Sequence, residues 1–89
     1  MSRRRVYSPE TLATMERFFT ALQVCLDNKQ IRNISYFCAH YGIDKRHLYA
    51  QRKERYRGFF EVSWLLPLVN DCAVSPLWLL TGKGTMFVQ

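Results

Sequence analysis

A chain of 89 residues in which 48% are hydrophobic suggests one small domain with a compact core and argues against a disordered segment. The formal net charge is +6, and much of it lies in Arg3–Arg5 and in residues 45–57. Clustered positive charge favours a polyanionic partner or an anionic membrane surface, although ordinary solubility also tolerates it. Because no stretch approaches the ~20 apolar residues of a membrane-spanning helix and no signal peptide is predicted, we expect a cytoplasmic protein without a membrane partner.

The first predicted helix begins at Ser8, where Ser-Pro-Glu supplies a capping serine, a proline at the first helical position and an acid in the first turn. We expect it to run to about Asp27. It carries an apolar stripe at helical spacing, made of Leu12, Met15, Phe19, Leu22 and Leu26. Phe18 and Val24 lie off this stripe and predict a second apolar face.

A second, short helix is predicted to follow Asn33, which can cap it. Its apolar residues at helical spacing are Ile34, Phe37, Cys38 and Tyr41. Gly42 then stands where a left-handed residue ends a helix, and Asp44 can cap a third helix only two residues later. Two helices joined by so short a turn must cross steeply, which predicts a helix-turn-helix at about residues 33–54.

After a predicted loop at 55–62, Ser63 is expected to cap a fourth helix, with Pro67 in its first turn, where a missing N–H costs least. Ser75, followed by proline, repeats the opening of the first helix and predicts a fifth, which Gly82 ends. No alternating strand pattern of useful length is present. The sequence therefore predicts an all-α domain with a compact arrangement of five helices.

The third helix is unusual in the distribution of its charges. Leu48 must face inward, because it is the helix's one strong aliphatic anchor. The residues predicted to lie opposite or beside it are Lys45, Arg46, His47, Tyr49, Ala50 and Lys53. A solvated helix face usually mixes charge signs, whereas Glu54 is the one acid between Asp44 and Glu61. This pattern favours a face that enters the major groove of DNA over a face that only meets water.

Two segments carry a family resemblance. FCAHYGIDKRHLYAQRK resembles the helix-turn-helix of lambda-repressor-like (XRE-type) DNA-binding domains, in which a small residue precedes the turn glycine by four places, an aliphatic residue follows the glycine and another lies six places beyond it. The matching residues are Cys38, Gly42, Ile43 and Leu48. VSPLWLLTGKGTMF is similar to the end of the same domain in phage-type repressors. The resemblance covers about residues 10–87.

This resemblance implies a compact lambda-repressor-like domain at residues 9–87, preceded by a basic N-terminal arm at 1–8. It implies a small transcriptional regulator or repressor that binds double-stranded DNA in a sequence-specific way, with the third helix in the major groove. The expected base-facing residues are Lys45, Arg46, His47 and Tyr49. The expected phosphate contacts are Asn33, Arg52, Lys53, Arg55 and Arg57. Arg3–Arg5 is either a DNA-contacting arm or an ordinary terminus.

Two positions depart from the family pattern. Ile34 stands where the family often has a phosphate-binding glutamine, which weakens any transfer of phosphate contacts from the family to this chain. Gln51 stands where an apolar or aromatic residue commonly fills the core, so we expect the third helix to be anchored differently. A homodimer is plausible because two half-sites multiply specificity, and Phe18 with Val24, or the C-terminal tail, are candidate interfaces.

The sequence offers no constellation for catalysis, so we expect no enzyme, no metal, no cofactor and no small-molecule ligand. TGKGT lacks the spacing and the preceding strand of a phosphate-binding loop. The three cysteines, Cys25, Cys38 and Cys72, match no zinc or disulfide pattern and are expected to be reduced core thiols.

Two other interpretations of the same residues stay open. In the first, the chain is a protein-interaction module of a phage or mobile-element regulator that keeps the helix-turn-helix fold. In the second, it is the N-terminal part of a longer repressor.

Overall fold

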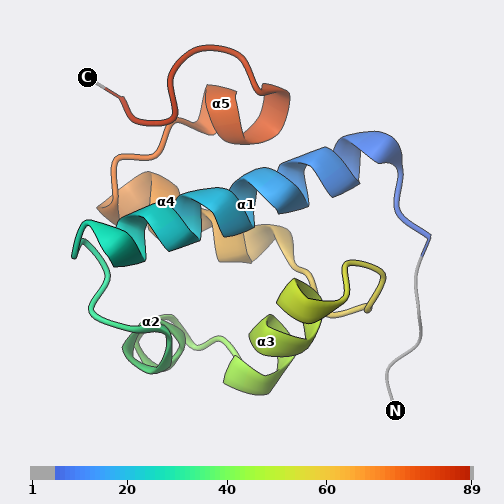
Figure 1. Cartoon of the computed structure of the whole chain (residues 1–89), viewed down its shortest axis with the longest axis horizontal. Coiled ribbons are helices and arrows are strands. Elements are labelled where there is room, and N and C mark those ends of the chain that lie inside the picture. The colour runs from blue at the N-terminus through green and yellow to red at the C-terminus, as the bar shows by residue number, and fades with distance from the viewer. Residues whose placement is uncertain (1–5, 89) are drawn as a thin grey trace.

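The structure, a computed structural model, describes residues 6–88 as a compact all-α globule with five α-helices and no strand among these residues (Figure 1). The α-helices are α1 (Pro9–Asp27), α2 (Ile34–Tyr41), α3 (Lys45–Lys53), α4 (Leu66–Asp71) and α5 (Pro76–Thr81), and a 3₁₀ turn, η1 (Val62–Leu65), leads into α4. One isolated antiparallel bridge joins Val74 to Phe87. This architecture confirms the predicted all-α class.

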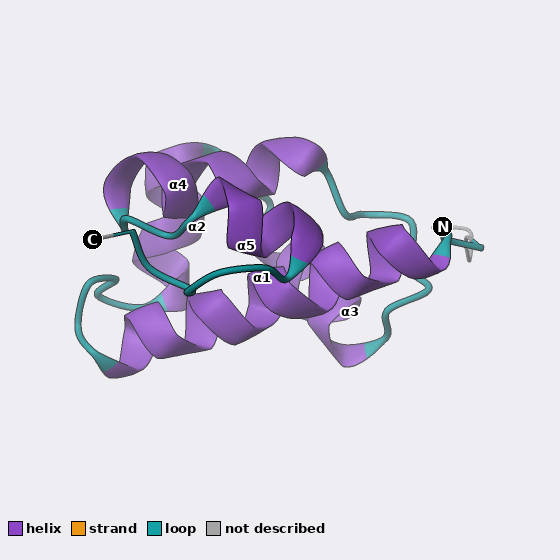
Figure 2. Ribbon diagram, turned by 90° about the horizontal axis from the view of Figure 1, so that it is seen from above, coloured by secondary structure: helices purple, strands orange, loops and turns teal. Residues whose placement is uncertain are grey.

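The other helices pack around the long helix α1, with α4 behind it in Figure 1. In Figure 1, α2 and α3 lie below α1 and α5 lies above it. Figure 2 views the molecule from the α5 side, where α5 and the C-terminal loop lie in front. The buried residues of α1 are Met15, Phe18, Phe19, Ala21, Leu22 and Cys25. Because these buried residues occupy more than one side of the helix, α1 contributes to the core toward several of its neighbours.

Phe18 is a core residue, so the prediction that it could pair two copies is wrong. Its side chain has no exposed surface. Its ring centroid lies 5.0 Å from that of Phe19 and 6.0 Å from that of Trp64. The second apolar face of α1 is therefore used inside the molecule, because η1 packs against it.

The predicted caps of the first and last helices are confirmed. The Ser8 hydroxyl accepts a hydrogen bond from the Thr11 N–H at 3.1 Å, and the Ser75 hydroxyl accepts one from the Trp78 N–H at 3.2 Å. Gly82 ends α5 in the left-handed conformation, at a φ of 77°.

The predicted cap at Ser63 is wrong, and Pro67 explains why. In an α-helix capped at residue 63, the carbonyl of Ser63 would accept a hydrogen bond from the N–H of residue 67, which proline lacks. The Leu66 N–H instead donates to this carbonyl, which gives the tighter 3₁₀ spacing. The α-helix then begins at Leu66, and Pro67 lies in its first turn as expected.

Side chains also tie distant helices together. The Tyr41 hydroxyl donates to Asp71 at 2.7 Å, which joins α2 to α4, and this hydrogen bond raises the pKa of Tyr41 to about 12. On the other side of the molecule, the Arg17 guanidinium donates to the Leu79 carbonyl at 2.7 Å and joins α1 to α5. Within residues 6–88, no helix is long and apolar enough to cross a bilayer.

The three cysteines are free and buried, as predicted. Burial raises the pKa of all three thiols, to about 12 for Cys25. Such thiols stay protonated near neutral pH and behave as small apolar side chains.

Candidate functional site

The α2–α3 pair is held by a short turn with a defined hydrogen-bond pattern. Asn33 caps α2 by accepting from the Tyr36 N–H at 2.7 Å. Gly42 ends α2 at a φ of 70°, and the Ile43 N–H returns to the Cys38 carbonyl at 2.9 Å. A Cβ at Gly42 would meet nothing within 4 Å, so the left-handed backbone alone favours glycine there. Figure 1 shows α2 end-on and α3 from the side, which confirms that the two helices cross steeply.

Asp44 caps α3, also as predicted. Its carboxylate accepts from the N–H groups of Arg46 at 2.9 Å and His47 at 3.4 Å. Desolvation acts to raise the pKa of Asp44, but the side-chain and backbone hydrogen bonds from Arg46, with that from His47, outweigh it and lower the pKa. The ionised carboxylate is therefore the form that the start of α3 favours.

Only two side chains of α3 are buried, Leu48 and Gln51, and neither has exposed surface. The inward position of Leu48 is confirmed. The Arg46 side chain is 89% exposed, and Tyr49 is 42% exposed. The outward face of α3 is formed by Lys45, Arg46, Tyr49 and Lys53. On α3 itself, four of nine residues are Lys or Arg and none is Asp or Glu.

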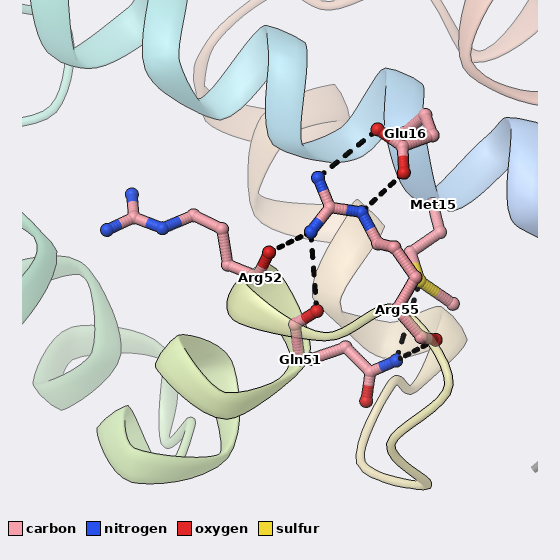
Figure 3. A network of polar contacts seen from close by, with 5 residues as sticks. All are labelled: Met15, Glu16, Gln51, Arg52 and Arg55. Atoms are coloured by element: carbon pink, nitrogen blue, oxygen red, sulfur yellow. Dashed lines mark hydrogen bonds and ion pairs between the residues drawn. The ribbon is translucent and has the colours of Figure 1, made fainter. Parts of the chain in front are cut away.

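Gln51 anchors the end of α3 through polar contacts. Its amide oxygen accepts from the N–H groups of Phe59 at 2.9 Å and Phe60 at 3.1 Å. Its amide nitrogen donates to the Arg55 carbonyl at 2.8 Å and lies 3.4 Å from the Met15 sulfur (Figure 3). One buried amide thus satisfies three backbone groups of the loop that follows α3.

Arg55 belongs to the same network. Its guanidinium pairs with both carboxylate oxygens of Glu16 on α1, at 2.5 and 3.2 Å (Figure 3). It also donates to the carbonyls of Gln51 and Arg52 and lies 4.6 Å from the centroid of the Phe19 ring. The predicted phosphate contact at Arg55 stays a prediction, but this guanidinium already joins the end of α3 to α1.

The first two predicted base-facing residues lie at the exposed start of α3. The Lys45 ammonium donates to the Ser35 hydroxyl on α2 at 3.1 Å. The Arg46 guanidinium lies 3.5 Å from the Asp44 carboxylate. Both contacts are solvent-exposed, and exposed pairs of this kind contribute little to stability, so both side chains can leave them for a ligand.

His47 differs from its neighbours, because its ring turns toward the loop. It stacks on Phe59, with ring centroids 4.1 Å apart and planes inclined by 8°. It also lines a cavity of 220 Å³ with Asp44, Glu61 and Ser63, and its Nε2 atom lies 3.7 Å from the Asp44 carboxylate. Of the predicted base-facing residues, His47 is the one already packed against the protein.

The remaining predicted residues lie on α3, in the loop that follows it and at the start of α2. The Arg52 guanidinium lies 5.1 Å from the centroid of the Tyr49 ring, and the Arg57 guanidinium lies 5.3 Å from that of Phe59. Lys53 is exposed at the last position of α3, whereas Asn33 lies at the start of α2. Arg3–Arg5 lies outside the described residues.

An exposed stack that begins just before α2 and continues along it was not predicted. The Arg32 guanidinium lies 5.2 Å from the centroid of the Tyr36 ring, which stacks on His40 at 5.6 Å. Tyr36 and His40 are four positions apart on α2, so helical spacing could have indicated their contact, whereas Arg32 precedes the helix. No group of His, Cys, Asp and Glu within residues 6–88 could hold a metal ion.

Comparison with protein-family models, with curated protein sequences and with solved structures found no match to this chain.

Proposed function

We propose that this chain is a compact lambda-repressor-like domain that binds double-stranded DNA sequence-specifically, as a small transcriptional regulator or repressor. In this proposal α2, the turn at Gly42 and α3 form the helix-turn-helix, and α3 enters the major groove. The observation that carries the proposal is the outward face of α3, with Lys45, Arg46 and Lys53 exposed on a helix that contains no acid.

The dimensions of α3 suit this role. An α-helix with its side chains is about 10–12 Å in diameter, which fits the roughly 12 Å width of the major groove, and nine residues extend about 13 Å along its axis. Arg46 lies in the first turn, from which a side chain can reach base edges, and its guanidinium can donate to both acceptors of a guanine. Tyr49 lies one turn further along and offers an exposed ring to a thymine methyl group.

Phosphate contacts are assigned to cations around this face. Lys53 and Arg52 end α3, Arg57 follows in the loop, and Asn33 lies at the start of α2, where backbone N–H groups favour an anion. Arg55 is assigned to the fold, because its guanidinium already pairs with Glu16. Pairing of two copies would present two α3 helices to two half-sites, and this pairing remains part of the proposal.

The first test is selection of bound sequences from a random DNA pool, followed by titration of the selected site at several salt concentrations. If about six phosphates are neutralised, log affinity falls with log salt at a slope of about −5. A slope near zero, or no duplex binding at low salt, would remove DNA from the proposal. Salt-insensitive capture of a protein would then favour a protein-interaction module that keeps the fold.

The second test distinguishes base recognition from electrostatic attraction. Arg46→Ala should relax sequence preference at one position of each half-site by about 1–3 kcal/mol. Lys53→Ala should weaken selected and scrambled sites about equally. If both variants lose affinity equally on both sites, α3 is an electrostatic anchor, and sequence preference has another source.

A further inference from the structure

A groove crosses the face formed by the first half of α1, η1, α4 and α5. It consists of two adjoining hollows, of 430 and 190 Å³, which share Val62, Leu65 and Leu80 as lining residues. No residue of α2 or α3 lines either hollow. The groove is therefore a surface separate from the outward face of α3.

The inner end of the groove is entirely aliphatic. Its further lining residues are Leu66, Val69, Pro76 and Leu79. Val62 is 74% exposed, Leu66 is 55% exposed and Leu80 is 56% exposed, although leucine and valine are usually buried. A contiguous aliphatic surface of this kind is typical of an interaction site, because covering it is favourable at about 25 cal/mol per Å².

The outer end of the groove adds two aromatic residues, Tyr7 and Phe60, and a polar side with one carboxylate. Glu10, Thr11 and Thr14 line it from successive turns of α1. Glu10 is exposed and forms no ion pair with any of residues 6–88. Although the chain carries a net charge of +6, neither hollow is lined by a Lys or Arg residue. The groove thus combines an aliphatic floor with one carboxylate at its open end.

We propose that this groove binds an amphipathic helix of a partner protein, with an aliphatic stripe over Val62, Leu66 and Leu80 and a Lys or Arg residue that pairs with Glu10. Helices bind such grooves through anchors at every third or fourth position. A purely apolar groove would not require a charged residue in the partner, whereas the exposed Glu10 carboxylate favours a Lys or Arg residue at one end of the bound helix. The proposal goes beyond DNA binding and does not depend on it.

A second copy of the chain fits this groove less well. In a two-fold dimer, the same patch faces itself. Because the described lining residues include no cation, the paired patches would bring no opposite charge from the groove itself to either Glu10 carboxylate. A basic partner helix satisfies the aliphatic floor and the carboxylate together.

The test begins with a displayed library of helical peptides of about 18 residues, about 27 Å long. Every third or fourth position is aliphatic, and the terminal positions vary among Lys, Arg, Glu and Gln. Selection against the wild-type chain should enrich peptides with Lys or Arg at one end. The proposal would be overturned if the wild-type chain enriched no peptides beyond those enriched by the Leu80→Lys variant, or if the enriched peptides lacked a basic end.

Two leucines of α5 provide a matched pair of variants. Leu80 and Leu77 are both 56% exposed, but only Leu80 lines the groove. Leu80→Lys should weaken the selected peptide about tenfold or more, because it places an unpaired charge on the aliphatic floor, and Leu77→Lys should not. Both should unfold at the wild-type temperature and bind DNA as the wild type does, so failure here is distinguishable from failure of the DNA proposal.

A separate variant tests whether Glu10 selects a basic end in the bound peptide. Glu10→Lys should shift the preferred peptide terminus from Lys or Arg to Asp or Glu, whereas Asp27→Lys, at the far end of α1, should leave it unchanged. The selected peptide should lose about two- to fivefold in affinity on Glu10→Lys. Sedimentation of the chain alone completes the test. A dimer that Leu80→Lys dissociates and Leu77→Lys does not would show that a second copy is the occupant, and would overturn the proposal.

Discussion

The α2–α3 pair and the η1–α4–α5 region differ in which side chains they expose. α3 buries two side chains, one of them polar, and exposes cations. The other region buries Trp64, Leu65, Leu68 and Leu79 and still exposes aliphatic side chains. Exposed cations are stable in water and can also neutralise a polyanion, which releases its counterions. Exposed aliphatic groups instead favour a partner that removes them from water.

The difference extends to how each region is anchored. The short helices α4 and α5 are held by many apolar contacts, each of modest energy, in one core cluster. α3 depends on one leucine and one glutamine, which leaves its other positions available for a ligand. A region with so few anchors should lose much of its stability when either is changed.

The largest expected effect comes from removing the aliphatic anchor of α3. Leu48→Ala should lower the free energy of unfolding by about 2–5 kcal/mol, because it leaves a cavity at a site with no exposed surface. Leu66→Ala, at a side chain that is 55% exposed, should change it by about 0.5 kcal/mol or less. Chemical denaturation of both variants measures the difference, and equal effects would contradict the contrast between the two regions.

The polar anchor provides the second prediction. Gln51→Leu keeps the volume but leaves the N–H groups of Phe59 and Phe60 and the Arg55 carbonyl without their amide partner. Each buried unsatisfied group costs about 1–3 kcal/mol, and water can reach part of the loop, so we expect a loss of about 2–4 kcal/mol. The control is Gln23→Leu on the exposed side of α1. A Gln51→Leu variant of unchanged stability would mean that an apolar side chain serves equally well here.

The third prediction separates the cations that hold the fold from those proposed to contact DNA. Arg55→Ala should lower stability by about 1–2 kcal/mol through the lost contacts to Glu16 and to two carbonyls, but should leave the salt dependence of DNA binding unchanged. Lys53→Ala should do the reverse, making the salt slope shallower by about one unit at unchanged stability. Unfolding curves and salt titrations of the two variants decide between these roles. A shallower salt slope for Arg55→Ala would show that Arg55 contacts phosphate as well.

The smallest effect is expected at the start of α3. Asp44→Ala should lower the unfolding temperature more than Asp44→Asn, because asparagine can still cap the helix. The pKa of Asp44 is lowered in the folded chain, so its ionised form contributes stability above its unfolded pKa of about 3.9, and this contribution is lost as the pH falls through the lower folded value. When the pH is lowered from 7 to 3, the unfolding temperature of the wild type should therefore fall further than that of Asp44→Asn. An equal fall would show that other carboxylates dominate.

The sequence by itself determined where most helices begin and end and which side of α3 faces inward. Ser8, Asn33, Asp44 and Ser75 cap helices within three residues of themselves, and Gly42 ends α2 through its own backbone conformation. The inward position of Leu48 follows from helical periodicity. These features depend on neighbours along the chain, so the order of residues is sufficient to predict them.

Only the tertiary structure decided how these helices are joined and which side chains remain available. Arg55 pairs with Glu16, a residue 39 positions away, and Phe18 is buried because η1 packs over it. The burial of Gln51 depends on a loop that returns beneath α3, and the groove depends on α1, η1, α4 and α5 meeting on one face. Such contacts bring together residues far apart in the chain, and neither helical periodicity nor capping patterns carry information about them.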